Sequence, residues 1–190
     1  MDLQHINVKL FAERPEAVDR EKFTLIFQGW IQDQVCDELL LDVADYLHVD
    51  AGPGIVLIGE EADFSMDETK HRLGLRYNRK RGLALDNAGK LAQALRAALQ
   101  ACLRLEADPR LGGKLTFNRR ELELFVNDRA VAPNTEATWT ACRGDLEKFF
   151  GKIFAGNTFK LERQPNPRER FGVTVKTEQD FDPQAILQAL

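Results

Sequence analysis

The side chains most capable of chemistry are concentrated between Leu41 and Asp63, in the segment LDVADYLHVDAGPGIVLIGEEAD. Six acidic residues and one histidine accompany a G-P-G turn there. Carboxylates are the preferred ligands of magnesium and manganese, and histidine binds many transition metals. One interpretation is therefore an enzyme that uses a divalent metal for hydrolytic or phosphoryl chemistry. Its ligands would be Asp42, Asp45, His48 and Glu60.

The spacing of these residues favours a simpler interpretation. On one regular strand Asp42 and His48 would be about 20 Å apart, too far to share an ion, whereas next-but-one neighbours are about 7 Å apart. The chain has only three histidines, at positions without a ligand-like spacing. A solvated strand face around Tyr46, His48 and Asp50 is thus preferred. No cofactor is expected, and a divalent metal belongs to the alternative alone.

A second candidate is the basic segment RYNRKR. Its side chains could contact phosphates or an acidic partner, and its tyrosine could stack on a base. The competing interpretation is an edge strand whose cations discourage aggregation between sheets. The loop QPNPRER adds a second cationic point through Arg163, Arg168 and Arg170. The proposed binding residues of the basic segment are Arg76, Tyr77, Arg79, Lys80 and Arg81.

Motifs of known catalytic sites are missing elsewhere. No Gly-Lys-Ser/Thr follows the G-P-G turn, so a phosphate loop is not indicated, and Gly52 and Gly54 are expected to supply positive φ around Pro53. No G-x-S-x-G elbow occurs, and Cys36 has no histidine near it in the sequence. These gaps favour a binding module over an enzyme.

Composition is that of a folded domain: 44% of the 190 residues are hydrophobic and 29% are charged. The net charge of −4 argues against a protein that coats nucleic acid or an anionic membrane along its whole surface. The N-terminus lacks a secretory signal pattern, and no apolar run approaches the ~18–20 residues of a membrane span. With three widely spaced cysteines, two of them on apolar helix faces, these features predict a cytoplasmic protein.

Hydrophobic periodicity predicts the secondary structure. Alternation of Ile6, Val8 and Leu10 indicates a half-buried strand, and apolar residues at helical spacing indicate helices around Phe23, Leu91, Trp139 and Ile186. Further strands are expected at 39–49, 55–60, 72–80, 114–117, 121–126, 158–163 and 171–176.

This order is β-α-β-β-β-α followed by β-β-α-β-β-α. Short hairpins imply antiparallel pairing, and helices with one apolar face imply that they cover one side of the sheet. We therefore expect a single α+β domain, 1–190, with an antiparallel sheet of about eight strands covered by helices on one side. Two related halves, 1–108 and 109–190, are a further hypothesis.

Three segments resemble an uncharacterised bacterial family of similar length: FQGWIQDQ, LLLDVADYLHVDAGPGIVLIG and LGLRYNRKR. The resemblance spans roughly the first half of the chain. It implies a stand-alone cytoplasmic protein and carries no catalytic assignment.

Taken together, these features predict a non-enzymatic binding module that engages a protein partner or a second copy of itself. The metal-dependent enzyme is the alternative. Single-stranded nucleic-acid binding is a third interpretation, disfavoured by the net charge; it needs exposed aromatic side chains, for which Tyr77 and Phe125 are the candidates.

Overall fold

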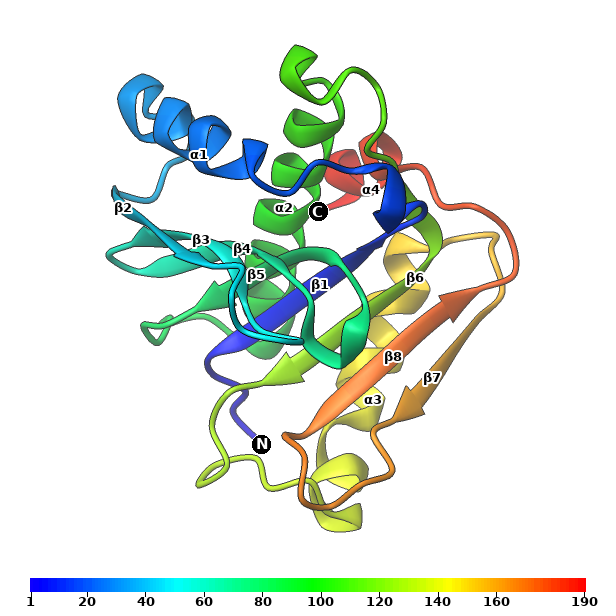
Figure 1. Cartoon of the computed structure of the whole chain (residues 1–190). Helices are drawn as coiled ribbons and strands as arrows, with labels where there is room; N and C mark the ends of the chain where they lie inside the picture. The colour runs from blue at the N-terminus through cyan, green and yellow to red at the C-terminus, as the bar shows by residue number, and fades with distance from the viewer.

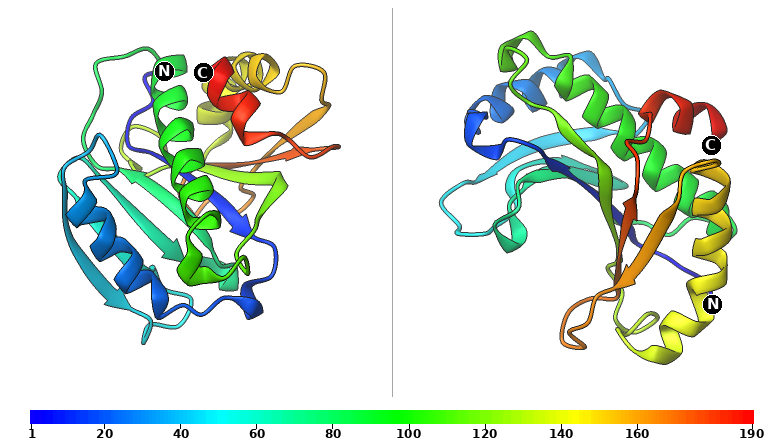
Figure 2. Two further views of the ribbon diagram at one scale, coloured as in Figure 1. Left: turned by 90° about the horizontal axis from the view of Figure 1, so that it is seen from above. Right: turned by 90° about the vertical axis from the view of Figure 1, so that its right-hand side faces the viewer.

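The chain folds into one eight-stranded antiparallel sheet with four α-helices against one of its faces, in a computed structural model that describes all 190 residues (Figure 1). The two further views in Figure 2 show that the sheet is strongly twisted and that the helices lie together on one side of it. The predicted α+β class and the one-sided helical layer are confirmed.

The helices are α1 (Lys22–Asp33), α2 (Asn87–Glu106), α3 (Glu136–Ile153) and α4 (Pro183–Ala189). The strands are β1 (Ile6–Ala12), β2 (Leu40–Tyr46), β3 (Gly54–Gly59), β4 (Ala62–Asp67), β5 (Gly74–Arg79), β6 (Phe117–Val126), β7 (Phe159–Arg163) and β8 (Gly172–Thr177). Short 3-10 turns occur at Pro15–Ala17, Thr69–His71 and Pro109–Leu111.

The strand order across the sheet is β2-β3-β4-β5-β1-β6-β8-β7. Both parts of the chain follow the same path: a central strand (β1 or β6), a helix, a meander of strands and a closing helix. In each part the last strand of the meander pairs with the central strand, and the first strand of the meander lies at the edge. Strands β1 and β6 join the two parts side by side.

Local sequence signals account for the helix boundaries. The Asp86 carboxylate accepts a hydrogen bond from the Gly89 N–H at the start of α2, and Thr135 caps α3 in the same way through the Thr138 N–H. In α4, Asp182 is the N-cap and Pro183 the first helical residue. None of the helices is both long enough and apolar enough to cross a membrane.

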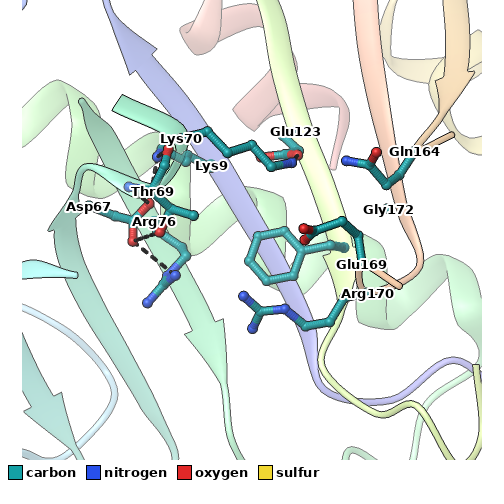
Figure 3. A pocket seen from close by; sticks show the side chains of 11 residues that line it. Lys9, Asp67, Thr69, Lys70, Arg76, Glu123, Gln164, Glu169, Arg170 and Gly172 are labelled. Carbon is teal, nitrogen blue, oxygen red and sulfur yellow. Dashed lines mark hydrogen bonds and ion pairs between the residues drawn. The ribbon is translucent and has the colours of Figure 1, made fainter. Parts of the chain in front are cut away.

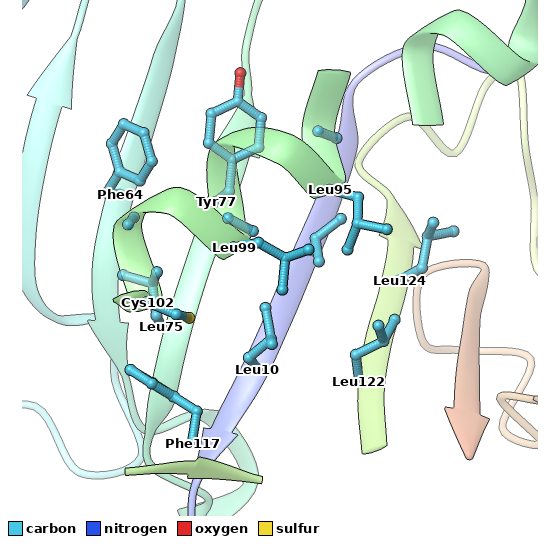
Figure 4. Packing of buried hydrophobic residues seen from close by; sticks show 14 of the residues in the cluster. Leu10, Phe64, Leu75, Tyr77, Leu95, Leu99, Cys102, Phe117, Leu122 and Leu124 are labelled. Carbon is cyan, nitrogen blue, oxygen red and sulfur yellow. The ribbon is translucent and has the colours of Figure 1, made fainter. Parts of the chain in front are cut away.

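The hydrophobic core fills the space between the helices and the sheet (Figure 4). Phe27, Trp30, Phe64 and Tyr77 form a chain of aromatic contacts with ring centroids 5.2–6.3 Å apart. Because this chain runs from α1 to β5, it ties the first helix to the middle of the sheet.

Two strand predictions were wrong. Strand β4 was not predicted, and the expected hairpin of 114–117 and 121–126 is one continuous strand, β6. The observed order is therefore β-α-β-β-β-β-α-β-α-β-β-α. Arg119 and Arg120, which resembled turn residues, lie where the register of β6 with β1 shifts, and they pair with Glu106 and Asp180 on neighbouring segments.

The description of β1 as half-buried was also wrong, because its residues are buried on both faces of the sheet except at the last position. At the G-P-G turn, Gly54 has the expected positive φ of 64°, whereas Gly52 does not. Gly52 is needed for space instead: a Cβ there would lie 2.8 Å from the Val49 carbonyl oxygen.

Candidate functional site

The candidate site lies on the face of the sheet that carries no helix, and Lys9 is its centre. Lys9 projects from β1, the strand in the middle of the sheet, yet only 2% of it is exposed. Lysine is almost never buried without a partner, since its charge loses the stabilising hydration of water. Its partners therefore define the site.

The first partner is Asp67 on β4, whose Oδ1 lies 2.5 Å from the Lys9 Nζ. Strand β5 separates β4 from β1, so the lysine side chain must cross it. It crosses where β5 has Gly74, the residue opposite Asp67 in the strand register. A Cβ on Gly74 would lie 3.1 Å from the Lys9 Cε and 2.3 Å from the Leu10 carbonyl oxygen.

Asp67 is the acceptor for several donors. Its Oδ2 lies 2.9 Å from Arg76 Nη1 and accepts a 2.8 Å hydrogen bond from the Thr69 hydroxyl. The Thr69 N–H donates to its Oδ1 at 3.2 Å. One buried carboxylate thus holds a lysine and an arginine in fixed positions (Figure 3).

The partners of Lys9 compensate its buried charge only in part. Burial lowers the pKa of Lys9, and the attraction of Asp67 only partly opposes that effect. Apart from Asp67, the acceptor nearest the ammonium is the Thr69 carbonyl oxygen, at a marginal 3.5 Å. Since an ammonium carries three N–H donors, Lys9 can accept a further partner.

A second arginine faces the first across the pocket. The Arg170 guanidinium stacks on the Phe125 ring at 4.7 Å from its centroid, and Nη1 donates to Asn127 Oδ1 at 3.0 Å. Figure 3 shows the guanidinium groups of Arg76 and Arg170 pointing toward each other. Burial lowers the pKa of Arg170, and the nearby charge of Arg76 lowers it further.

These groups surround a small pocket of about 40 Å³. A water-sized group needs about 10–15 Å³ by the same kind of measure, so the pocket has room for three or four such groups. Its charged lining consists of four cations and three carboxylates: Lys9, Lys70, Arg76 and Arg170 with Asp67, Glu123 and Glu169. The lining is net positive, although the whole chain is net negative.

The predicted basic segment is not one surface. Arg76 lines the pocket, but Tyr77 is fully buried on the helical side, where its hydroxyl donates to Glu38 Oε1 at 3.0 Å. Arg79 is also buried there and pairs with Glu61, while Lys80 and Arg81 pair with Asp63 and Glu60. Strand β5 is internal, so the edge-strand interpretation was wrong as well.

The predicted metal ligands do not come together. Asp42, Asp45, His48 and Glu60 are all exposed, and Glu60 pairs with Arg81. Nowhere in the chain do three or more His, Cys, Asp or Glu side chains form a group that could hold a metal ion. The carboxylates of Asp42 and Asp45 instead accept hydrogen bonds from the Val43 and Leu47 N–H groups.

The aromatic candidates for nucleic-acid stacking are also buried. Tyr77 is 0% exposed, and Phe125 is 8% exposed beneath Arg170. Neither ring offers a free face to a base.

Sequence reasoning identified Arg76 and noted Arg170, but it missed Lys9 and Asp67. Lys9 alternates with Val8 and Leu10, the usual pattern of a solvated polar face. Nothing local showed that the opposite face would be buried too. Gly74, one position N-terminal to the apolar Leu75, was the available sign that another chain segment crosses β5.

No protein-family model matches the chain, and no curated protein is significantly similar to it in sequence. The resemblance to an uncharacterised bacterial family therefore stays a prediction.

Proposed function

We propose that this chain is a binding module, and that it binds a carboxylate group in the pocket between Lys9, Arg76 and Arg170. The observation that carries the proposal is the pair of arginines, Arg76 and Arg170, that line one pocket close enough for their charges to repel. Like charges in that arrangement repel, and an anion between them would turn repulsion into attraction.

The hydrogen-bond donors support an anion rather than a cation. Each guanidinium has five N–H donors. Arg76 contacts only the Asp67 carboxylate through Nη1, and its Nε is buried without a partner. Arg170 uses Nη1 on Asn127. A bound acceptor would satisfy the unused donors, and arginine suits carboxylate because its planar fork matches two oxygens.

The size of the pocket selects the class of anion. Room for three or four water-sized groups accommodates the three non-hydrogen atoms of a carboxylate. A phosphate has five such atoms and would need the lining to move. The pocket opens on the helix-free face, so the remainder of a larger ligand can lie across the sheet.

Isothermal titration calorimetry with succinate, acetate and inorganic phosphate tests the proposal. Acetate has four non-hydrogen atoms; at about 1 kcal/mol for each, its Kd is on the order of 1 mM. Succinate and acetate should bind the wild type, and R170Q should weaken both at least tenfold. R168Q, a matched change in the same loop outside the pocket, should leave them unaffected. Tighter binding of phosphate than of either carboxylate, or equal binding by R170Q, would overturn the proposal.

A further inference from the structure

Strand β7 is an edge of the sheet whose outer backbone groups have no partner strand. The Gln164 N–H donates to the Gly172 carbonyl, and the Thr158 carbonyl accepts from the Glu178 N–H. Even-numbered residues therefore bond toward β8. By the alternation of an antiparallel strand, the N–H and C=O groups of Phe159, Leu161 and Arg163 point away from the sheet.

The sequence of this strand, FKLER, is complementary to itself when reversed. We propose that a second copy of this chain pairs with it in antiparallel orientation, with the two-fold axis at Leu161. Phe159 then lies opposite Arg163 of the partner subunit, and Lys160 opposite Glu162 of the partner subunit. The outward-pointing residues are the ones that would exchange backbone hydrogen bonds, so the register satisfies both strands.

The charges on the helix-free face favour such a partner. Lys160 lies directly opposite Lys176 in the β7–β8 register, and like charges in that position destabilise a sheet. Lys176 has its own carboxylate, because its Nζ is 2.7 Å from Glu162 Oε2, whereas Lys160 forms no ion pair within the chain. The second copy supplies the carboxylate that Lys160 lacks.

The same edge carries a groove of about 520 Å³ that is lined by three apolar and four charged side chains. Trp139 of α3 lines it together with Phe159 and Leu161 of β7. The two-fold axis would bring this groove against its own counterpart, so that both strands lose apolar surface to water. Symmetric pairing through one patch is the commonest arrangement of protein dimers.

The opposite edge, β2, does not suit the same pairing. Its exposed charged side chains, Asp42 and Asp45, are both acidic, so two copies would repel each other. The Asp42 carboxylate already accepts a hydrogen bond from the Val43 N–H. Side chains at the β2 edge therefore compete with an added strand for backbone N–H groups. At β7 they do not.

Sedimentation equilibrium of the full chain tests the dimer through exchanges of charge. Wild type should be a dimer. K160E and E162K should each be monomeric, because each places like charges opposite one another twice. An equimolar mixture of K160E and E162K should recover a dimer, and so should the double variant K160E/E162K. The exposed positions of both residues keep the fold intact, which circular dichroism verifies.

Asp42→Lys at the other edge is the matched control and should leave the dimer unchanged. A wild type that stays monomeric at every concentration would overturn the inference, as would a dimer that survives both single variants. So would a dimer that D42K disrupts and K160E does not. The pocket variant R170Q should not alter the mass, so this result is independent of carboxylate binding.

Discussion

Lys9 Nζ lies 2.5 Å from Asp67 Oδ1 although strand β5 separates their strands. The contact exists because Gly74 has no side chain where the lysine crosses. Three strands therefore cooperate in one ion pair, and that pair holds Arg76 at the pocket. The geometry of the pocket depends on this crossing.

Replacing Gly74 with alanine should destabilise the protein by about 3 kcal/mol. The new Cβ would lie 2.3 Å from the Leu10 carbonyl oxygen, which belongs to the backbone of the central strand and has no room to move. Urea denaturation of the variant measures the loss. Gly144→Ala is a matched control within α3, where a Cβ meets nothing within 4 Å. Because alanine favours helix, that control should gain about 0.5–1 kcal/mol. An equal change in the free energy of unfolding of the two variants would contradict the close packing around Gly74.

Asp67 should matter more to stability than Lys9 does. Asp67→Asn leaves a buried lysine and arginine without their carboxylate and should cost about 3–5 kcal/mol. Lys9→Met should cost only about 1 kcal/mol, because Asp67 keeps Arg76 and both Thr69 donors. Chemical denaturation of the two variants and the double variant gives the coupling. A larger cost for K9M than for D67N would show that the carboxylate is not the centre of the network.

The fold was largely predictable because most elements carry a local signal. The apolar stripe of α2 and the caps Asp86, Thr135 and Asp182 need only neighbouring residues. Strand β4 was missed because three of its six residues are polar: Asp63, Ser65 and Asp67. The side chains of these residues lie on the helix-free face of the sheet.

The site was less predictable because it depends on contacts between distant segments. Lys9 and Asp67 are 58 residues apart, and Arg170 comes from a loop at the other end of the chain. The dense acidic stretch forms no common site. Alternation along β2 and the turn leaves Asp42, Asp45 and Asp50 at exposed positions, and its other three carboxylates pair with basic residues at the end of β5: Glu60, Glu61 and Asp63. Residue types alone do not show which distant segments meet.

The partly buried thiol of Cys36 should react slowly with iodoacetamide. Burial raises its pKa to about 11, and the charge of Glu38 adds to the effect. The thiolate is the reactive form, so at pH 8 the rate should be about 100-fold below that of a thiol with the ordinary value of 9.0. The rate should rise tenfold for each pH unit up to about pH 11, as measured by mass spectrometry. Alkylation as fast as in the urea-denatured chain would contradict the burial of Cys36.

The exposed acidic residues should be dispensable for stability. Asp42→Asn and Asp45→Asn should each change the free energy of unfolding by no more than about 0.5 kcal/mol, because both side chains face solvent. Addition of magnesium or manganese should leave Tm unchanged in the wild type and in both variants. A metal-dependent rise in Tm that either variant abolishes would contradict the placement of these carboxylates.

The proposed binding of a carboxylate between Arg76 and Arg170 can be measured in solution. The most direct measurement is a titration of the ¹⁵N-labelled protein with acetate, following the Nε–Hε signals of arginine by nuclear magnetic resonance. The signals of Arg76 and Arg170 should move together and saturate with one Kd on the order of 1 mM, while that of Arg168 stays in place. Shifts that never saturate, or that affect Arg168 as much as the two pocket arginines, would contradict carboxylate binding in the pocket.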